Sequence, residues 1–443
     1  MNTLEKIYSA LPVWGQHGLC SLQGWLVQRR RFNSEFKCLL RQFEDYKIDG
    51  VAQLRSFMTE SSKIPYYRDL FAEVGVNTTA PDITLELKKC PVLEKDFVRN
   101  HTDVFINHSY RGRSFLNHTS GTTGSGMIFP YSCDMEHRQW AVWWRYRRKH
   151  GIQFDTWCGW FGGRKIIFNE QRKPPYYRLN IPGRQVMFSA HHLSPATVES
   201  YYQTIKDRHL TWLHGYPSQL AFFTSLCIEK QFNALLEVKN ITFGAENLLE
   251  CQKKIIQGFF PNAKLTQHYG LSEGVANISE MPDGTLRVDD DFCYVEFLPV
   301  SKDDPSLCRI IGTGFSNLAF PLLRYDTGDL ARITEKDGLR SIISIDGRNE
   351  DYITLRDGSK LGRLDHLFKD FPEVRESQIY QPSLDLLEIR IVKNLTYTVE
   401  TEKRLSTILS EWFSGKINWR IVYCNKLQRT SSYKLKFVLS DIR

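Results

Sequence analysis

Thr119-Ser120-Gly121-Thr122-Thr123-Gly124-Ser125-Gly126 is a run of glycine and small hydroxyl residues, and the apolar segment Met127-Ile128-Phe129 follows it directly. Glycines let the backbone approach a phosphate, and backbone N–H groups together with hydroxyls can surround the phosphate oxygens. The run lacks the GxxxxGK[ST] spacing of a Walker loop, because no lysine follows Gly126. A flexible surface linker is the alternative interpretation, since loops of this composition are common.

Four further short motifs follow this run along the chain. They are His268-Tyr269-Gly270-Leu271-Ser272-Glu273, Arg324-Tyr325-Asp326-Thr327-Gly328-Asp329-Leu330, Gly347-Arg348-Asn349-Glu350-Asp351 and Gln428-Arg429-Thr430-Ser431-Ser432-Tyr433-Lys434. In the first, a glutamate just after a strand-like segment could hold Mg²⁺, and the tyrosine could stack on a base. In the second, an aspartate in a tight turn could accept hydrogen bonds from ribose hydroxyls. Each motif alone is explained equally well as an ordinary exposed turn or loop.

Composition limits the class of protein. The chain has 443 residues, of which 42% are hydrophobic, so it can bury a large core and global disorder is excluded. No uncharged apolar run reaches the roughly 18 residues of a membrane-spanning helix. The 58 Lys+Arg against 50 Asp+Glu give a net charge of +8, which suits a nucleic acid, an anionic lipid surface or a nucleotide equally.

The pattern of apolar residues predicts an α/β fold with layered sheets. Short apolar runs typical of strands alternate with stretches of helical periodicity between residues 100 and 330. The strand-like runs are 165–168, 241–243, 264–267, 294–297 and 309–311, and the helical stretches are 196–208 and 217–231. Helical spacing also runs from Glu35 to Phe57. A polar segment at 346–351 suggests a hinge, so we expect a large N-terminal domain over 1–347 and a small C-terminal domain over 348–443.

The N-terminal segment 7–28 is moderately apolar and ends at Arg29-Arg30-Arg31. One interpretation is an interfacial helix whose Trp25 and arginines touch a membrane surface. The interpretation we favour is a helical region that packs on the main body, because the only basic cluster is the three arginines. The ten scattered cysteines contain no CxxC pair and no signal peptide is apparent, so we expect a cytoplasmic, reducing location.

Trp140, Trp143 and Trp144 are followed closely by Arg145, Arg147, Arg148 and Lys149. Aromatic and basic residues in this pattern can bind single-stranded nucleic acid. The i, i+3, i+4 spacing of the tryptophans is also what a packed amphipathic helix requires. We favour the packed helix, with tryptophans in the core and charges facing water, and expect no specific nucleic-acid partner.

Taken together and in order, the five motifs resemble those of the adenylate-forming superfamily of acyl-CoA synthetases, peptide-synthetase adenylation domains and luciferases. The chain is most similar to the branch of phenylacetate-CoA ligases and CapK-type proteins, which are associated with capsule polysaccharide clusters. Segments 64–68, 91–95, 161–164 and 215–218 also resemble that branch. The resemblance implies a large N-terminal α/β domain of layered sheets and helices and a small, mobile α+β C-terminal domain.

The resemblance also implies roles for individual residues. Lys434 matches the catalytic lysine of the C-terminal domain, Glu273 the magnesium-binding glutamate, and Glu350 the hinge position. Asp329 matches the aspartate that binds the ribose, with Arg348 beside it, and Tyr269 the residue that stacks on adenine. The full set expected to bind ATP or AMP is Ser120, Gly121, Thr122, Thr123, Gly124, Gly244, Ala245, Glu246, Tyr269, Gly270, Ser272, Asp329 and Arg348.

The lysine motif departs from the family pattern, and the residues of an acyl pocket are open to a second interpretation. The residue before the catalytic lysine is usually glycine, but here it is Tyr433, and Lys436 is a second candidate for the lysine. Residues that could line the acyl pocket are Arg164, His191, His192 and Tyr216. Each of them could instead satisfy structural hydrogen bonds.

The implied activity is ATP-dependent and AMP-forming, with Mg²⁺ as cofactor. A carboxylic acid is activated as an acyl-adenylate, pyrophosphate is released, and the acyl group passes to a second acceptor in surface polysaccharide biosynthesis. The acceptor stays open among coenzyme A, an amine and a sugar hydroxyl, as does the oligomeric state. The alternatives are a phenylacetate-CoA ligase-like enzyme acting on an aryl acid, and a nucleotide-binding pseudoenzyme that serves as an assembly partner.

Overall fold

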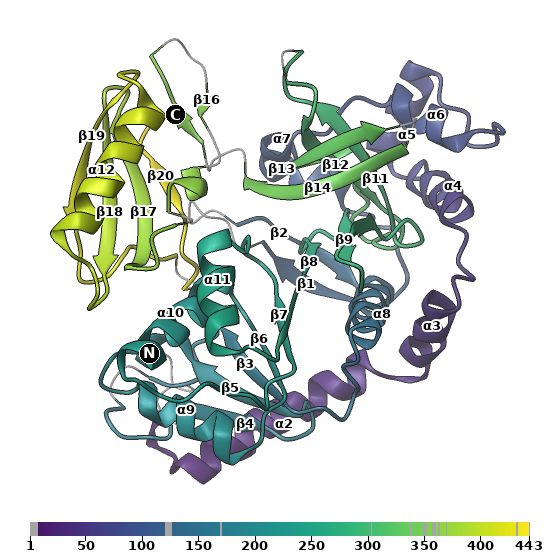
Figure 1. The fold of residues 1–443 in the computed structure, drawn as a ribbon. Helices are drawn as coiled ribbons and strands as arrows, with labels where there is room; N and C mark the ends of the chain where they lie inside the picture. The colour runs from purple at the N-terminus through teal and green to yellow at the C-terminus, as the bar shows by residue number, and fades with distance from the viewer. Residues whose placement is uncertain are drawn as a thin grey trace. The chain divides into compact units, whose positions relative to one another are not determined.

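The computed structural model describes residues 8–119, 126–168, 171–302, 304–336, 339–348, 352–356, 360–361, 364–368, 370–430 and 433–442 (Figure 1). The chain divides into two compact units. Unit 1 comprises residues 1–25, 154–267 and 347–443, and unit 2 comprises residues 26–153 and 268–346. The C-terminal segment that begins at Gly347 therefore groups with the middle of the chain, and each unit is described by itself below.

Unit 1 contains a mostly parallel sheet with strand order β8-β7-β6-β3-β5-β4. The strands are β3 (Cys158–Gly162), β4 (Tyr177–Asn180), β5 (Gln185–Ser189), β6 (Trp212–Gly215), β7 (Asn240–Phe243) and β8 (Lys264–Gly270). Only β4, at the edge, pairs in the antiparallel sense. Strands of parallel sheets are buried on both faces, which explains why the sequence showed them as short continuous apolar runs.

Three helices accompany these strands: α9 (Val198–Asp207), α10 (Pro217–Glu229) and α11 (Glu250–Phe259). Their buried residues join those of the strands in one core, in which Leu213, Leu220 and Phe223 have no exposed surface. The helices confirm the periodicity seen at 196–208 and 217–231. The strand expected at 165–168 is wrong, since Ile166 and Ile167 are both buried beside Met187 without forming a strand.

The C-terminal part of unit 1 has its own sheet, in the order β19-β18-β17-β20, and its own apolar core. The elements are β15 (Ile353–Thr354), β16 (Lys360–Leu361), η3 (Leu364–Phe368), β17 (Val374–Ser383), β18 (Leu386–Lys393), α12 (Val399–Phe413), β19 (Asn418–Tyr423) and β20 (Val438–Ser440). Leu405, Leu409 and Phe413 of α12 are fully buried against this sheet, at the i, i+4 spacing of one helix face.

Unit 2 begins with helices and ends with long antiparallel strands. The helical elements are α3 (Ser34–Glu44), α4 (Gly50–Ser61), α5 (Pro65–Val74), α6 (Ile83–Lys89), α7 (Lys95–Asn100), η1 (Thr102–Phe105) and α8 (Cys133–Lys149). The strands are β1 (Ser114–His118), β2 (Ile128–Ser132), β9 (Asn277–Glu280), β10 (Leu286–Val288), β11 (Cys293–Pro299), β12 (Leu307–Gly314), β13 (Tyr325–Lys336) and β14 (Leu339–Arg348). The helix α2 (Val13–Arg31) and strand β8 each run across the division between the units.

The helical spacing from Glu35 to Phe57 is confirmed, but it covers two helices with a break between them. Helix α3 ends at Glu44, and Tyr46 takes a left-handed φ of 52°. Asp49 then starts α4, since its carboxylate accepts the N–H groups of Val51 and Ala52 at 2.9 and 3.1 Å. An aspartate in that position is a strong helix start, so the apolar spacing continues across a real break.

Helix α8 confirms the packed interpretation of the tryptophan segment but corrects its charges. Trp144 is buried, and the indole N–H of Trp143 donates to Asn277 Oδ1 at 2.9 Å. The expectation that the basic residues face water is wrong for Arg145 and Arg147, which are buried. The Arg147 guanidinium lies 5.1 Å from the Trp144 ring centre, and Arg145 forms ion pairs with Asp289 and Asp291.

Within the described residues, no helix combines the length and apolarity needed to cross a bilayer.

The buried pairing of Arg145 generates a stability prediction for unit 2. Substituting Arg145→Ala leaves two buried carboxylates without their cation, so we expect a loss of about 3–5 kcal/mol in the free energy of unfolding. The matched control is Arg148→Ala on the same helix, because its ion pair with Glu44 is partly exposed and is worth about 1 kcal/mol or less. Urea unfolding of both variants measures the difference, and equal losses would contradict a buried ionic centre.

Candidate functional site

In unit 2, the structure brings the predicted adenine and ribose residues together. Tyr269 lies at the end of β8, and its hydroxyl donates to Asp329 Oδ2 at 2.7 Å. Burial raises the pKa of Tyr269 well above its ordinary value, and the neighbouring Asp329 carboxylate raises it further. The phenol therefore stays protonated and acts as a donor to the carboxylate, which fixes both side chains.

The turn that carries Asp329 is held by its own side chains. Gly328 has a left-handed φ of 73°, and its N–H donates to Asp326 Oδ1 at 2.9 Å. The N–H of Asp329 donates to Thr327 Oγ1 at 3.1 Å, and Thr327 in turn donates to the carbonyl of Ile310. These bonds explain why aspartate, threonine and glycine occur together here, because each supports the turn that presents the last aspartate.

Glu273, the predicted magnesium ligand, is buried among polar partners of the same unit. The Tyr325 hydroxyl donates to Glu273 Oε1 at 3.1 Å, and Lys95 Nζ lies 3.7 Å from the same oxygen. Lys95 also donates to the carbonyl of Thr327 at 3.4 Å. Neither Lys95 nor Tyr325 was given a role from the sequence, although both lie within segments that resemble the family.

The residues around Glu273 fit magnesium only in a limited way. Over the described part of the chain, no group of three or more His, Cys, Asp or Glu side chains could hold a metal ion. Mg²⁺ commonly binds proteins through one or two carboxylates and takes its other ligands from water and substrate phosphates. Glu273 fits such a site as a single carboxylate ligand.

Gly270 and Ser272 lie in the same segment as Tyr269 and Glu273. A side-chain carbon at Gly270 would lie 2.8 Å from Asn277 Oδ1, so the position has room only for glycine. The carbonyl of Ser272 accepts from Asn117 Nδ2 at 3.3 Å. The hydrogen bond from Asn117 fixes the Ser272 end of this segment, and the close approach of Asn277 explains why residue 270 is glycine.

In unit 1, the segment Gly244-Ala245-Glu246 follows β7 directly and has a strained backbone. Ala245 has a φ of 68°, which costs a residue with a side chain about 1–2 kcal/mol. Such strain persists only where the surroundings impose it, and it often marks functional segments. The next residue, Glu246, is held by contacts with two other segments.

The Glu246 carboxylate accepts two backbone hydrogen bonds from distant segments. Oε2 accepts the N–H of Ser218 at 3.2 Å, and Oε1 accepts the N–H of Leu435 at 3.0 Å. Because Pro217 has no N–H, the Ser218 donor is the first available at the start of α10, where a negative charge is favoured. Burial raises the pKa of Glu246, and the hydrogen bonds from Ser218 oppose that rise.

Lys434 is carried by a tight loop in unit 1. Its N–H donates to Thr430 Oγ1 at 3.0 Å, while the N–H of Thr430 donates to the carbonyl of Lys434 at 2.9 Å. The ammonium group of Lys434 lies 5.4 Å from the centre of the Tyr216 ring. Gln378 joins the two ends of the loop, since its side-chain amide donates to the carbonyls of Gln428 and Lys436 at 3.0 and 2.8 Å.

Tyr433 adopts a left-handed φ of 63°, the conformation that glycine adopts at low cost. Glycine is the residue that the family resemblance leads us to expect at this place, so Tyr433 differs from the family pattern in its side chain but has a backbone that suits glycine. The ring of Tyr433 lies 4.3 Å from the His191 ring and 5.3 Å from the Arg429 guanidinium. Arg429 in turn forms an ion pair with Glu376. These ring and ion contacts are what hold a tyrosine in a glycine conformation.

The residues expected to line an acyl pocket separate into two groups. His191, through Tyr433, and Tyr216 both lie beside the Lys434 loop. Burial lowers the pKa of His191, and the positive charge of Lys165 lowers it further. His192 instead contacts its own segment, with Nδ1 2.8 Å from Ser189 Oγ and its ring stacked on Tyr176.

Burial raises the pKa of the Tyr216 phenol, and the positive charge of the exposed Arg164 opposes that rise.

Several predicted residues lie outside the described part of the chain: Ser120, Gly121, Thr122, Thr123, Gly124 and Glu350. The backbone of Arg348 ends β14, and its side chain is also outside the described part. The phosphate-loop and hinge assignments therefore stay predictions.

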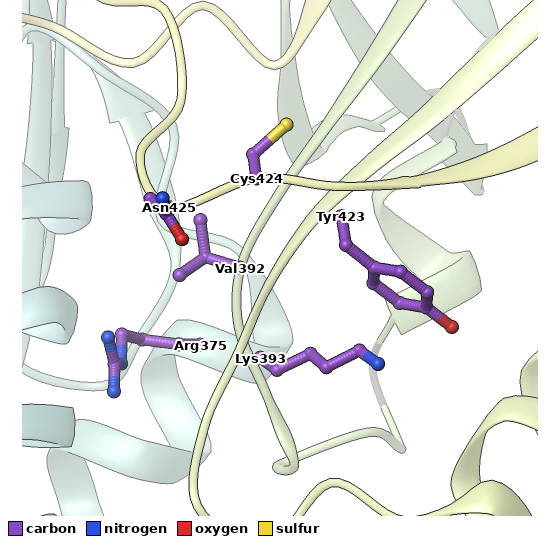
Figure 2. Close-up of a pocket in the computed structure, with 6 residues that line it drawn as sticks. All are labelled: Arg375, Val392, Lys393, Tyr423, Cys424 and Asn425. Atoms are coloured by element: carbon purple, nitrogen blue, oxygen red, sulfur yellow. The ribbon is translucent and has the colours of Figure 1, made fainter.

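A cavity of about 290 Å³ in the C-terminal part of unit 1 contains none of the predicted site residues (Figure 2). Its lining residues are Arg375, Val392, Lys393, Tyr423, Cys424 and Asn425. Both of its cations are engaged, because Arg375 pairs with Glu229 and Lys393 Nζ lies 3.3 Å from the centre of the Tyr423 ring. Its charges therefore serve packing, and we assign it no role.

Comparison with known proteins supports the family resemblance. Residues 354–441 match the family model of the CapK C-terminal domain. Over 99% of its length, the chain is 23% identical to protein CapK of Staphylococcus aureus, all of which is covered. The predicted resemblance to the CapK-type branch is confirmed. The chain is also 27% identical to a phenylacetate-coenzyme A ligase of Pseudomonas putida, over 72% of this chain and 75% of that one.

The fold agrees with this family. A crystal structure of a 2-hydroxyisobutyryl-CoA ligase in the postadenylation state matches with a TM-score of 0.64 and 16% identity, over 89% of each chain. The predicted α/β architecture of an adenylate-forming enzyme is therefore confirmed. The boundary between 347 and 348 and the mobility of the C-terminal domain stay predictions.

The left-handed backbone at Tyr433 generates a prediction for the Lys434 loop. Tyr433→Gly and Tyr433→Ala both remove the ring, but only alanine keeps the strain of a side chain at positive φ. We expect the glycine variant to be more stable than the alanine variant by about 1 kcal/mol, measured by urea unfolding. An alanine variant of equal or greater stability would show that the loop does not hold this conformation.

Proposed function

We propose that this protein is an ATP-dependent, AMP-forming ligase that activates a carboxylic acid. A carboxylate oxygen of the acid forms a bond to the α-phosphorus of ATP, the bond from that phosphorus to the bridging oxygen breaks, and pyrophosphate leaves. A second nucleophile then attacks the acyl carbon, AMP leaves, and the nucleophile loses its proton. The confirmed family resemblance and fold support this proposal, and the clusters around Asp329 and Lys434 supply its residues.

The observation that carries the proposal is the link between Lys434 and the Glu246 segment. The residue after Lys434 donates its N–H to Glu246, in the segment proposed as a wall of the adenine pocket, and Lys434 lies over Tyr216. Attack of a carboxylate on a phosphate brings anions together, and an ammonium group nearby reduces that repulsion and stabilises the leaving pyrophosphate. The glycine-like backbone before Lys434 favours this lysine over Lys436 for the role.

Asp329 is proposed to bind the ribose of ATP. The Tyr269 hydroxyl donates to its Oδ2 at 2.7 Å and holds the carboxylate in one orientation. The same hydrogen bond fixes the Tyr269 ring, which is proposed to stack on adenine. Preorganisation of both groups by one hydrogen bond lowers the entropy cost of binding the nucleotide.

Glu273 is proposed to hold Mg²⁺ together with the phosphates of ATP. When bound, the cation would neutralise charge on the phosphates and polarise them toward attack. Lys95, 3.7 Å from the same carboxylate, would help to hold Glu273 in its orientation. Arg348, Ser120, Thr122 and Thr123 complete the proposed phosphate and nucleotide contacts on the strength of the resemblance alone.

Coenzyme A is the acceptor that we propose, because two of the similar proteins are named as coenzyme A ligases. The half-buried His191, whose pKa is lowered by its burial, and Tyr216 favour an acid whose remainder is aromatic or polar and uncharged. A role in surface polysaccharide biosynthesis, with an amine or a sugar hydroxyl as acceptor, rests only on the resemblance to CapK-type proteins.

Pyrophosphate exchange into ATP tests the proposed reaction. With a panel of aryl, amino and uronic acids, we expect exchange with at least one acid and a fall of about a hundredfold or more in Lys434→Ala. Lys436→Ala is the matched control and should retain exchange near the wild-type rate. Exchange that survives in Lys434→Ala but not in Lys436→Ala would move the role to Lys436, and tight ATP binding without exchange would indicate a pseudoenzyme.

The ribose assignment has a separate test. Asp329→Ala removes hydrogen bonds from a charged acceptor to the nucleotide, so KM for ATP should rise about tenfold or more. Tyr269→Phe keeps the ring and loses only the bond to Asp329, so its KM should rise less. The KM for the acid should change little in both variants, and a change confined to the acid would contradict the assignment.

A further inference from the structure

Helix α2 turns its polar side chains toward the protein. Gln16 Oε1 accepts from Arg178 Nε at 2.7 Å, and His17 Nδ1 accepts the N–H of Leu179 at 3.2 Å. One turn later, the Ser21 hydroxyl donates to the carbonyl of Leu179 at 3.1 Å. All three residues thus contact β4, the edge strand of the unit 1 sheet, along which α2 runs (Figure 1).

The contact is close as well as polar. A side-chain carbon at Gly24 would lie 1.8 Å from Asn180 Oδ1, and Ser21 Oγ accepts the N–H of Ile181 at 3.2 Å. The helix is therefore fixed in its rotation about its own axis, and the orientation of its other face is determined.

The face that α2 turns to solvent is apolar. Trp14 is 78% exposed, Leu22 54% and Trp25 44%, and Leu19 is also exposed. At 100° per residue these four side chains lie within about 140° of one another on the helix. A surface helix normally has the reverse arrangement, with apolar residues inside, so this face indicates an interaction surface.

The two chain segments that form α2 and β4 carry basic but no acidic residues. Residues 6–34 contain no Asp or Glu, and neither do residues 171–198, which include β4 and its flanking segments. The exposed side chains Arg172, Lys173 and Arg184 belong to the second segment. An exposed apolar helix face with tryptophans, on a helix that packs against a strand with exposed cations in its flanking segments, complements the headgroup region of an anionic bilayer.

We propose that the outward face of α2, with the basic residues flanking β4, docks on an anionic lipid surface. Trp14, Leu19, Leu22 and Trp25 would enter the interface, where tryptophan is favoured because its ring is apolar and its N–H is polar. Arg172, Lys173 and Arg184 would face the lipid phosphates. This goes beyond the ligase activity. The expected packing of the N-terminal segment on the body is confirmed for the face of α2 that contacts β4, and the proposal concerns only the opposite face. Arg30 and Arg31, which the membrane interpretation included, instead pair with Glu136 at 2.7 and 2.9 Å.

Vesicle flotation of the full chain tests the proposal. We expect binding to vesicles of phosphatidylcholine with phosphatidylglycerol, weaker binding to phosphatidylcholine alone, and a decrease with added salt. The double variant Trp14→Ser/Trp25→Ser should reduce binding about tenfold or more, because two interfacial tryptophans are lost. Arg172→Glu/Arg184→Glu should abolish the preference for the anionic vesicles.

The matched control is Trp412→Ser, which removes an exposed tryptophan from α12 in the same unit. It should bind vesicles like the wild type. Absence of binding to both kinds of vesicle, equal loss in the control, or unchanged binding by the double variant would each overturn the proposal. A wild-type dimer that the double variant dissociates, without vesicle binding, would assign the face to a second copy instead. Pyrophosphate exchange measured without vesicles separates this outcome from failure of the proposed activity.

Discussion

The Glu246 carboxylate joins two parts of unit 1 that are far apart along the chain, since its partners Ser218 and Leu435 come from the start of α10 and from the C-terminal loop. A carboxylate withdrawn from water needs hydrogen-bond donors, and here the backbone N–H groups of Ser218, in α10, and of Leu435, in the C-terminal loop, donate to it. This one side chain, next to the strained Ala245, therefore connects the start of α10 with the residue after Lys434. Any movement of the Lys434 loop away from α10 must break the bond to Leu435 and leave the carboxylate with one donor fewer.

Unit 2 uses the same principle at Asp329. Its turn is fixed by bonds from backbone N–H groups to neighbouring side chains, and Tyr269 then uses the fixed carboxylate as an acceptor. In both units an acidic side chain is oriented before any substrate binds. Orientation in advance would favour the proposed adenylation, because positioning and electrostatics contribute strongly to catalysis of attack on a phosphate.

The sequence predicts the general architecture and the candidate motifs, because both depend on local patterns. Parallel strands such as β7 and helices such as α9 and α10 are visible as apolar runs and periodicity. Contacts between distant segments are not visible, and so the pairing of Lys95 with Glu273 and of Arg429 with Glu376 was missed. The expectation that the basic residues of α8 face water is wrong for Arg145, because Asp289 and Asp291 are buried beside it and pair with it. Tyr433 at positive φ breaks a local preference and needs its ring contacts to explain it.

The packing of α2 on β4 also protects the sheet of unit 1. An edge strand presents backbone N–H and C=O groups to which a strand from another molecule can add, and this addition is a common start of aggregation. Here the side chains of His17 and Ser21 occupy such groups of Leu179 and Ile181. The helix therefore covers backbone groups of β4 that a further strand would otherwise pair with. Removal of this helix would expose an edge strand that can pair with another chain and aggregate.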